Sequence, residues 1–413
     1  MRKSGGAAIP MRVVNFQESF IRDVDFLIGG AAIETSPLEP YCDEVVEFLN
    51  RVSHCLMQDK RTRGFPDVVS FAYWCRRANV FLRREEAFRG DSLFESRVGR
   101  GLVFHVAPSN VPVNFAFSFA FGLLSGNANV VRVPSRPFDQ IAIICDALRY
   151  VLPHFANIFS RTAIVRYPRE SEATSYFCSL ADARIIWGGD DTVKRIRALD
   201  VRPRCIDIVF PDRYSAAVID AESIADLSED ELEKVARNFY NDTYLMDQNA
   251  CSSPQMVFWI YPELWTKERF WRAVRKVAQD RYHLQGAVVM DKYVQLCSDV
   301  IEGKALVPQV FDGLLCVVNV AELPDTITDL RGKGGFFYEH DVNNVSDILP
   351  FVTERFQTIS YYGIEPHTLQ KTIMSSHVRG VDRIVPIGQA MDIDVVWDGY
   401  DIVGCLSRIV DVR

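Results

Sequence analysis

The chain has 413 residues, of which 46 are Lys or Arg and 54 are Asp or Glu, so its formal net charge is −8. With 48% hydrophobic and 24% charged residues, it has the proportions of a soluble globular protein of two or three domains. The acidic balance argues against nucleic-acid binding, which needs a basic face, and the 12% aromatic content excludes a disordered chain.

Residues 1–80 are expected to be helical and irregular, because apolar residues recur at helical spacing over 43–56. From about residue 98 the pattern changes to short, nearly continuous apolar runs separated by helical stretches. Such runs predict parallel strands buried on both faces, as in nucleotide-binding βαβ domains. The predicted strands are 101–107, 129–133, 162–167, 183–187 and 205–210, and the predicted helices are 113–125, 137–151, 171–180 and 192–199.

A second α/β series is expected after Pro254, following a charged helix over 228–241. Its predicted elements are strands at 255–260 and 313–320 and a helix at 264–277. The fold class is therefore α/β, with a Rossmann-type parallel-sheet cofactor domain and an α/β catalytic domain. We expect four regions. Residues 1–80 are a helical region packed on the cofactor domain, and residues 81–243 are the nucleotide-binding domain. Residues 244–390 are the catalytic domain, and residues 391–413 are a tail that is a candidate oligomerisation segment.

Cys251 is the first candidate functional residue. It lies in Asp247-Gln-Asn-Ala-Cys-Ser-Ser-Pro-Gln, between a predicted helix and a predicted strand, among small and polar residues. A substrate can reach a thiol in such a segment, and nearby amides can stabilise its thiolate. On the local sequence alone, a structural loop cysteine remains the alternative.

Asn110 and Arg132 each follow or end a strand of the first series. The Asn110 amide, in Ala-Pro-Ser-Asn-Val-Pro, is suited to donate a hydrogen bond to a developing oxyanion, although an Asn between prolines also forms turns or caps helices. Arg132 is a candidate ligand for a ribose hydroxyl or a phosphate, and the alternative is a strand-edge arginine in water.

Gly188 and Gly189, between a strand and a helix, allow a backbone to approach a ligand closely. The following Asp190 and Asp191 also suit ordinary helix capping, and they oppose a pyrophosphate at that helix end. No Gly-x-Gly-x-x-Gly follows a strand, and Gly-x-Ser-x-Gly and Walker motifs are absent. No metal site is expected, because no Cys/His cluster has zinc-ligand spacing.

The ten cysteines are spread along the chain without a Cys-x-x-Cys pair, so we expect reduced thiols and a cytoplasmic protein. The most apolar stretch, 115–124, has about half the length of a membrane span, and no membrane span is expected. We interpret this stretch as a buried helix.

Taken together, these segments resemble the aldehyde dehydrogenase superfamily and, within it, the LuxC-type acyl-CoA reductases. Pro108-Ser-Asn-Val-Pro resembles the superfamily's Pro-Trp-Asn-Phe-Pro, and Trp187-Gly-Gly-Asp resembles the segment that faces the cofactor. The Cys251 segment resembles the nucleophile segment in its acyl-CoA reductase form. The motifs occur in the expected order between residues 40 and 410, including a LuxC-like tail over 379–408.

A further stretch, from Gly126 to Ser135, resembles Gly-Asn-x4-Lys-Pro-Ser of the superfamily. Arg132 replaces the lysine, and Val133 is an additional residue. The resemblance therefore implies that Arg132 and Ser135 bind the cofactor together with Gly188 and Gly189.

The resemblance implies an aldehyde-dehydrogenase-like fold and an oxidoreductase that reduces an acyl thioester to the aldehyde. The implied thioester is acyl-CoA or acyl-protein, and the implied acyl group is a fatty acyl group. NADPH is the implied cofactor, with NADH as the alternative. Cys251 is implied as the nucleophile that forms an acyl-enzyme, and Asn110 as the oxyanion donor. A homo-oligomer and an acyl-activating synthetase partner are implied as well.

One departure from the superfamily is the absence of its Glu-Leu-Gly-Gly segment, whose Glu activates the water that hydrolyses the acyl-enzyme. The corresponding stretch, 205–215, has no Glu, although Asp207 is near that position. An enzyme without this base is expected to protect its thioester from water, as a reductase requires. The alternatives are a semialdehyde dehydrogenase or an acyl-phosphate reductase of the same fold, and a non-catalytic scaffold of an acyl-transfer complex.

Overall fold

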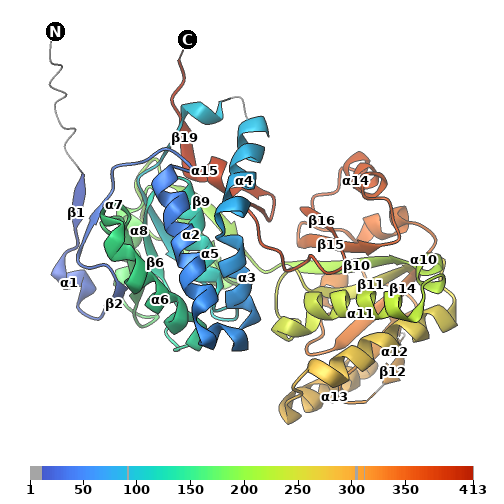
Figure 1. The fold of residues 1–413 in the computed structure, drawn as a ribbon. Helices are drawn as coiled ribbons and strands as arrows, with labels where there is room; N and C mark the ends of the chain where they lie inside the picture. Colours follow the sequence, from blue (N-terminus) through green and yellow to red (C-terminus); the bar gives the residue numbers. More distant parts are fainter. Residues whose placement is uncertain (1–11, 91–92, 303–305, 311, 413) are drawn as a thin grey trace, which may run out of the picture. The chain divides into compact units, whose positions relative to one another are not determined.

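A computed structural model describes residues 12–90, 93–302, 306–310 and 312–412, and these form two compact units (Figure 1). The first unit contains the described residues up to Pro211 and those from Tyr400 onward, and the second is Asp212–Gly399. This division differs from the expected boundaries at 80/81, 243/244 and 390/391. The main reason is that the chain segment directly after Pro211 forms a central strand of the second unit's sheet.

The first unit is built on a six-stranded sheet of order β2-β7-β6-β5-β8-β9. All pairs are parallel except that of β2 with β7. The five predicted strands are confirmed, with ends that differ from the expectation by at most one residue. The strands are β2 (Asp25–Ile28), β5 (Leu102–Val106), β6 (Ala128–Arg132), β7 (Thr162–Arg166), β8 (Ala183–Trp187) and β9 (Ile206–Phe210).

Strand β5 shows how this sheet is covered on both faces. Leu102, Phe104 and Val106 join the hydrophobic core on the side of α8 (Ala173–Leu180) and α9 (Asp190–Arg197). Because side chains alternate along a strand, His105 lies on the other side, where its Nδ1 is 2.8 Å from Ser118 Oγ of α5 (Asn114–Leu124). Every residue of α5 is buried, which confirms the prediction of a buried helix for the most apolar stretch.

The N-terminal part of the first unit is only partly helical. Residues 43–74 form α2 and α3 as expected, but three short strands lie between residues 13 and 34, where helical or irregular structure was predicted. These strands have three or four residues, which is too short for a periodic pattern to show. The remaining elements of the unit are β1 (Val13–Asn15), α1 (Glu18–Ile21), β3 (Ala32–Glu34), α2 (Asp43–Gln58), η1 (Lys60–Gly64), α3 (Pro66–Trp74), α4 (Arg77–Gly90), η2 (Phe94–Ser96), β4 (Arg97–Gly99), α6 (Asp139–Val151), η3 (Leu152–His154), α7 (Ala156–Phe159), β18 (Tyr400–Asp401), α15 (Ile402–Leu406) and β19 (Ser407–Ile409).

The second unit has a seven-stranded sheet of order β12-β13-β14-β11-β10-β15-β16, parallel except for the edge strand β12. One face packs on α11 (Glu229–Thr243) and α12 (Leu264–Arg281), and the other on α14 (Pro366–Ser375) (Figure 1). The strands are β10 (Tyr214–Asp220), β11 (Pro254–Ile260), β12 (Leu306–Val310), β13 (Cys316–Val320), β14 (Phe336–Val342), β15 (Phe356–Tyr362) and β16 (Arg383–Pro386).

The predicted helices at 228–241 and 264–277 are confirmed as α11 and α12, and both are slightly longer than expected. The other elements of the second sheet and its helices were not predicted from the sequence, namely β10, β12, β14, β15, β16, α10, α13 and α14. The remaining elements are α10 (Ala221–Ala225), η4 (Tyr244–Met246), α13 (Gly286–Ile301), η5 (Ile327–Asp329), η6 (Val345–Phe351) and β17 (Val396–Trp397). In the part of the chain that the structure describes, no helix combines the length and the hydropathy that crossing a bilayer requires.

Candidate active site

Cys251 lies at the amino edge of the second sheet, three residues before β11 begins at Pro254. The strands on both sides of β11 run parallel to it, so the segments that precede them reach the same edge. Asp212 and Arg213 precede β10 on one side, and Arg331 precedes β14 on the other. Cys251, an exposed residue, is therefore flanked by charged residues that precede both neighbouring strands.

The Cys251 segment begins with a sharp turn. Asp247 and Gln248 both have left-handed backbone conformations, with φ of 51° and 61°, so the chain reverses after η4. The buried Gln248 side chain then fixes the turn, because its amide donates to the carbonyls of Pro254 (3.1 Å) and Phe336 (3.0 Å) and accepts from the Gly335 N–H (3.2 Å). The turn is thus held to both β11 and β14.

Three hydroxyl groups hold the backbone around Cys251. Ser215 Oγ donates to the Cys251 carbonyl at 2.7 Å and accepts from the Thr358 N–H at 3.2 Å. Ser253 Oγ donates to the Asp242 carbonyl at 2.8 Å, and Ser252 Oγ contacts the Met391 sulfur at 3.6 Å. These contacts bind the main chain and the neighbouring side chains, and they leave the Cys251 side chain exposed.

Asp242, near the end of α11, connects this loop to a distant part of the chain. Its buried carboxylate accepts hydrogen bonds from the backbone N–H groups of Gly388 (2.6 Å) and Ala390 (2.9 Å). Desolvation by burial raises the pKa of Asp242 to about 7, and the two N–H groups act in the opposite direction. The segment that carries Met391 is thereby held beside the nucleophile segment.

The thiol of Cys251 is desolvated by its surroundings although part of the residue remains open to solvent. This desolvation raises the pKa of the Cys251 thiol above its ordinary value, and a hydrogen bond from the Arg213 backbone lowers it. The carboxylates of Asp212 and Asp398 add to the rise, while the Arg331 guanidinium opposes it. Any ligand that brings positive charge or further N–H donors to this edge favours the reactive thiolate.

The sequence-predicted residues of the first unit lie at the carboxyl edge of its sheet. Asn110 is exposed in the turn between β5 and α5, and Arg132 ends β6. The Arg132 guanidinium lies over the Tyr167 ring at 4.7 Å, and Ser135 Oγ donates to the Tyr167 carbonyl at 3.0 Å, so the structure brings Arg132 and Ser135 together.

Gly188 and Gly189 follow β8 at the same carboxyl edge. A side chain added at Gly189 would meet no atom within 4 Å, whereas one at Gly188 would be 3.1 Å from Thr192. The strand order reverses between β6-β5 and β8-β9, and ligands of open α/β sheets bind where the order reverses in this way. Open space next to the backbone at this position fits a cofactor that approaches the Gly189 turn.

The candidates are thus divided between the two units. Cys251 belongs to the second unit, and Asn110, Arg132, Ser135, Gly188 and Gly189 belong to the first. Within its own unit, Asp207 makes a double contact with Arg184, at 2.7 and 2.8 Å. This carboxylate is therefore a partner of a buried arginine in the described structure.

Several residues of the Cys251 site were not predicted from the sequence. Asp212 and Arg213 lie in the same segment as Asp207, the residue of that segment that was considered as an acid or base. The pairing of Asp212 with Arg331 (2.8 Å) and the contacts of Asp242 join residues more than one hundred positions apart, so no local pattern reveals them. Charged residues directly before a buried strand are the one local signal that was available.

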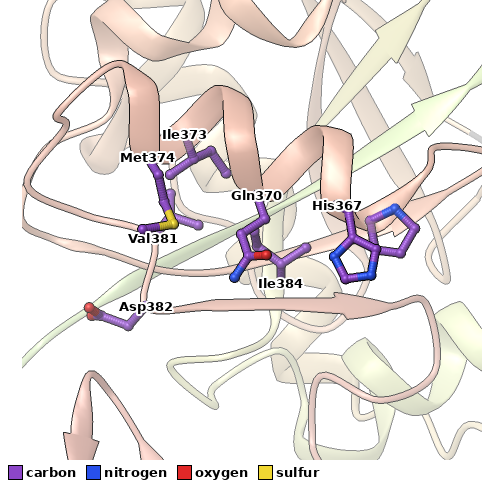
Figure 2. Close-up of a pocket in the computed structure, with 8 residues that line it drawn as sticks. His367, Gln370, Ile373, Met374, Val381, Asp382 and Ile384 are labelled. Atoms are coloured by element: carbon purple, nitrogen blue, oxygen red, sulfur yellow. The ribbon is translucent and has the colours of Figure 1, made fainter.

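The second unit also contains a pocket of about 380 Å³ between α14 and β16. Figure 2 shows His367 at one end of this pocket and Asp382 near the other, with Ile373, Met374 and Ile384 along its length. None of the lining residues was expected in the site, but Asp382 also forms an ion pair with Arg213. No group of three or more His, Cys, Asp or Glu residues suited to a metal ion occurs among the residues that the structure describes.

Solved structures of low sequence identity share the fold of this chain. A Thermus 1-pyrroline-5-carboxylate dehydrogenase with bound NAD superimposes with a TM-score of 0.57 at 13% identity, covering 89% of this chain and 80% of that one. An NADP-dependent glyceraldehyde-3-phosphate dehydrogenase from Bacillus halodurans gives 0.56 at 14% identity, covering 89% and 85%. The chain has an aldehyde-dehydrogenase-like α/β fold, as the resemblance implied.

The family follows from the sequence comparisons. The chain belongs to the acyl-CoA reductase (LuxC) family, whose model matches residues 78–291, just over half of its length. A long-chain acyl-protein thioester reductase from Aliivibrio fischeri is 25% identical over 308 residues, which cover 73% of this chain and 60% of the relative. One from Vibrio harveyi is 24% identical over 323 residues, covering 75% and 63%. The matched region thus spans under two thirds of the relatives' length.

Proposed function

We propose that this protein reduces an acyl thioester to the aldehyde through an acyl-enzyme on Cys251. The observation that carries the proposal is the arrangement of the Cys251 loop, in which hydrogen bonds from Ser215 and Gln248 fix the main chain while Cys251 remains open to solvent. Family membership and the names of the relatives, which describe thioester reductases, support the same reaction.

In the proposed reaction, the Cys251 thiolate attacks the carbonyl carbon of the acyl thioester and expels the donor thiol. One thioester replaces another, so this step needs little free energy. The side-chain amide of Asn110 is the proposed donor to the tetrahedral oxyanion, a role that the resemblance assigns to it. One such donor lowers the barrier by roughly 2.7–4 kcal/mol.

The acyl-enzyme must then persist until it is reduced. Segment 205–215 contains no Glu, and its Asp207 is bound by Arg184 in the first unit. These two contacts occupy both carboxylate oxygens of Asp207. We therefore infer that the acyl group on Cys251 is protected from hydrolysis, which favours a reductase over a semialdehyde dehydrogenase.

The proposed cofactor is NADPH, with NADH as the alternative, and the first unit is the proposed cofactor domain. When bound, the reduced nicotinamide supplies the hydride that converts the acyl group to the aldehyde. The open Gly189 turn fits a close backbone approach, and Arg132 Nε is buried without a hydrogen-bond partner among the described residues. Gly188, Gly189, Arg132 and Ser135 are the proposed cofactor ligands, with Arg132 favouring the 2′-phosphate.

The proposed substrates are fatty acyl groups carried either on CoA or on a protein. The family's description refers to acyl-CoA, while the relatives are named acyl-protein thioester reductases, so both donors need testing. An acyl-activating synthetase is the proposed partner, since such an enzyme generates the thioester or acyl-protein that is consumed here. We further propose a cytoplasmic homo-oligomer.

The test is intact-protein mass spectrometry after mixing with acyl-CoA thioesters of several chain lengths, with Cys251→Ala as the matched variant. We expect an acyl adduct on the wild-type protein alone, and its discharge by NADPH with release of aldehyde. The absence of an adduct with every CoA thioester and acylated carrier protein contradicts the proposal. Acyl phosphates then test for an acyl-phosphate reductase, and failure to bind any reduced nicotinamide indicates a scaffold.

A further inference from the structure

Helix α13 of the second unit, labelled in Figure 1, presents apolar side chains to solvent. Six exposed residues recur along it at helical spacing: Met290, Tyr293, Val294, Cys297, Val300 and Ile301. The five large hydrophobic ones are between 49% and 84% exposed. An isolated globular domain normally turns such a face toward its core. We refer to these six residues as the α13 stripe, and a continuous apolar surface of this kind marks an interaction site.

The opposite face of α13 carries polar anchors. The buried Lys292 ammonium donates to the carbonyls of Gly334 (2.6 Å) and Leu314 (3.3 Å). The buried Asp299 carboxyl accepts a 2.5 Å hydrogen bond from the Tyr338 hydroxyl of β14. Turning α13 about its axis to bury the α13 stripe would break these bonds, which is costly for buried polar groups. The anchors therefore hold the helix with its apolar face outward.

The charges on α13 restrict what can cover the stripe. None of the six side chains is charged at neutral pH, and Asp291 is the exposed charged residue of this helix. A helix that lies in a membrane surface carries exposed Lys or Arg beside its apolar face, whereas Lys292, the one basic residue of α13, is buried. A strongly charged protein partner would find no complementary charge here. The stripe therefore fits an uncharged apolar surface.

A second copy of α13 is such a surface. The stripe is symmetric about Cys297, because Val294 and Val300 lie three residues before and after it, and Tyr293 and Ile301 lie four residues before and after it. In an antiparallel pair with a two-fold axis at Cys297, Val294 of one copy faces Val300 of the other, and Tyr293 faces Ile301. Two-fold interfaces require this self-complementarity. Since each copy has a net charge of −8, two copies approach most easily through an uncharged face.

We propose that the α13 stripe is a two-fold interface with α13 of a second copy of this chain, in which the two helices run antiparallel and the axis passes at Cys297. The inference goes beyond the proposed function, which includes a homo-oligomer but assigns no surface to it. It places a subunit contact on α13, whereas the sequence pointed to the tail at 391–413. It does not depend on the chemistry of Cys251.

Cys297 itself tests the position of the axis. Axes of packed helices are about 8–10 Å apart and Cα atoms lie about 2.3 Å from each axis, so two Cys297 Cα atoms that face each other are roughly 3.5–5.5 Å apart. A disulfide spans Cα–Cα distances of about 4.4–6.8 Å. Copper–phenanthroline in air removes two electrons and two protons from a pair of thiols and should therefore link two copies.

Denaturing electrophoresis without reductant measures this cross-link at low micromolar protein. The Cys251→Ser background removes the other exposed cysteine among the described residues. We expect a dimer band in this background and none once Cys297→Ser is added. Val201→Cys in the double-serine background is the control, because Val201 is an exposed valine of the first unit, and it should give no dimer band.

The register is tested in the same double-serine background. Val294→Cys and Val300→Cys proteins, mixed before oxidation, should form a cross-linked pair. Either variant alone should give a several-fold weaker band, because two copies of the same residue are then offset by six residues, about 9 Å along the helix.

Sedimentation equilibrium of the unoxidised protein measures the native mass. Val294→Glu/Ile301→Glu places carboxylates at two positions that are exposed in the single chain, so its fold should be retained, and thermal unfolding verifies this. In the interface each carboxylate would face an apolar side chain. We expect a dissociation constant at least about 30-fold larger and, at low micromolar concentration, half the wild-type mass. The control Val201→Glu should keep the wild-type mass.

The proposal requires both results. A mass that is unchanged in Val294→Glu/Ile301→Glu, or the absence of both the Cys297 cross-link and the mixed cross-link, overturns it. A monomeric wild type that sediments with phosphatidylcholine vesicles, and no longer does so in the Glu variant, overturns it in favour of a lipid surface. Neither measurement uses a thioester or a nicotinamide, so failure here is distinguishable from failure of the acyl-adduct test of the proposed function.

Discussion

The backbone N–H of Gly388 donates a 2.6 Å hydrogen bond to the carboxylate of Asp242, which lies 146 positions earlier in the chain. Asp242 is near the end of α11, and the Ser253 hydroxyl donates to its backbone carbonyl. Asp242 therefore binds the Gly388 turn through its side chain and the nucleophile segment through its main chain. The two segments are expected to move, or to lose order, together.

The first prediction concerns Asp242 and pH. Burial raises the pKa of Asp242 to about 7 in the folded protein, well above that of an unfolded Asp, roughly 3.9. The folded state therefore binds this proton more tightly, and the stabilisation from protonation is complete below about pH 4 and is lost as pH rises through about 7.

Asp242→Asn removes this titration. Urea unfolding of both proteins across this pH range should show the wild type losing up to about 4 kcal/mol relative to the variant, at roughly 1.4 kcal/mol per pKa unit. Asp398, whose pKa burial raises to about 6, titrates in both proteins and cancels in the comparison. Parallel stability curves would contradict the assignment.

The second prediction concerns Ser215. This fully buried hydroxyl joins the Cys251 carbonyl to the Thr358 N–H, so Ser215→Ala leaves both backbone groups without this partner. We expect a loss of about 1–3 kcal/mol in the free energy of unfolding. Hydrogen exchange should become faster in the Cys251 segment. Ser223→Ala is the control, because the half-buried Ser223 hydroxyl donates to the Asp220 carboxylate, and it should leave exchange in the Cys251 segment unchanged.

The third prediction separates two roles for Asp207. Arg184 is only 2% exposed, so Asp207→Asn leaves a buried guanidinium without its counter-charge and should cost about 3–5 kcal/mol of stability. The half-life of the acyl adduct on Cys251 should stay within twofold, roughly 0.4 kcal/mol, of the wild-type value. A clearly longer half-life would instead identify Asp207 as a base that activates water.

The fourth prediction concerns the choice of cofactor. If Arg132 binds the 2′-phosphate, Arg132→Met should weaken NADPH binding by about 10- to 100-fold and leave NADH binding nearly unchanged. Fluorescence titration with both nucleotides measures the two affinities. Arg166→Met is a suitable control, because Arg166 ends the neighbouring β7 and contacts the Pro134 carbonyl. Equal losses for both nucleotides would remove the basis for an NADPH preference.

The first sheet was predictable from the sequence because its strands are buried on both faces. Residues in such strands form continuous apolar runs, and the glycine turns between them mark the strand ends. The five parallel strands were therefore found with small errors at their ends. The additional antiparallel strand β2 was missed, since four residues give no usable pattern.

The second sheet was less predictable because tertiary contacts permit charge inside it. Glu339, in the middle of β14, is only 1% exposed and interrupts the apolar run. Its carboxylate lies 3.1 Å from Lys267 Nζ and accepts hydrogen bonds from the indole N–H groups of Trp259 and Trp271, at 2.9 and 2.8 Å. Those partners come from β11 and α12, so a single-strand pattern cannot show that the position is buried.

The candidate site was predictable only in its local part. Small and polar residues around Cys251 indicated a reachable thiol, and the structure places this cysteine in an exposed turn between a helix and a strand. The residues that hold the turn, such as Ser215 and Asp242, and the partners of Arg213 come from other strands and loops. Their roles follow from strand order and register, which the sequence pattern did not contain.

Cys251 lies before the first residue of β11, so it is at one end of this strand and remote from the other end. β11 has seven residues, so its last residue lies about 20 Å from its first at 3.3 Å per residue. Tyr261, directly after β11, is 59% exposed and belongs to a surface turn. A fluorophore or a fused carrier protein attached at that turn would be remote from the thiol. Loop length there can change without disturbing the anchors of the nucleophile, which makes the far edge of the sheet the natural place for tethering a partner enzyme.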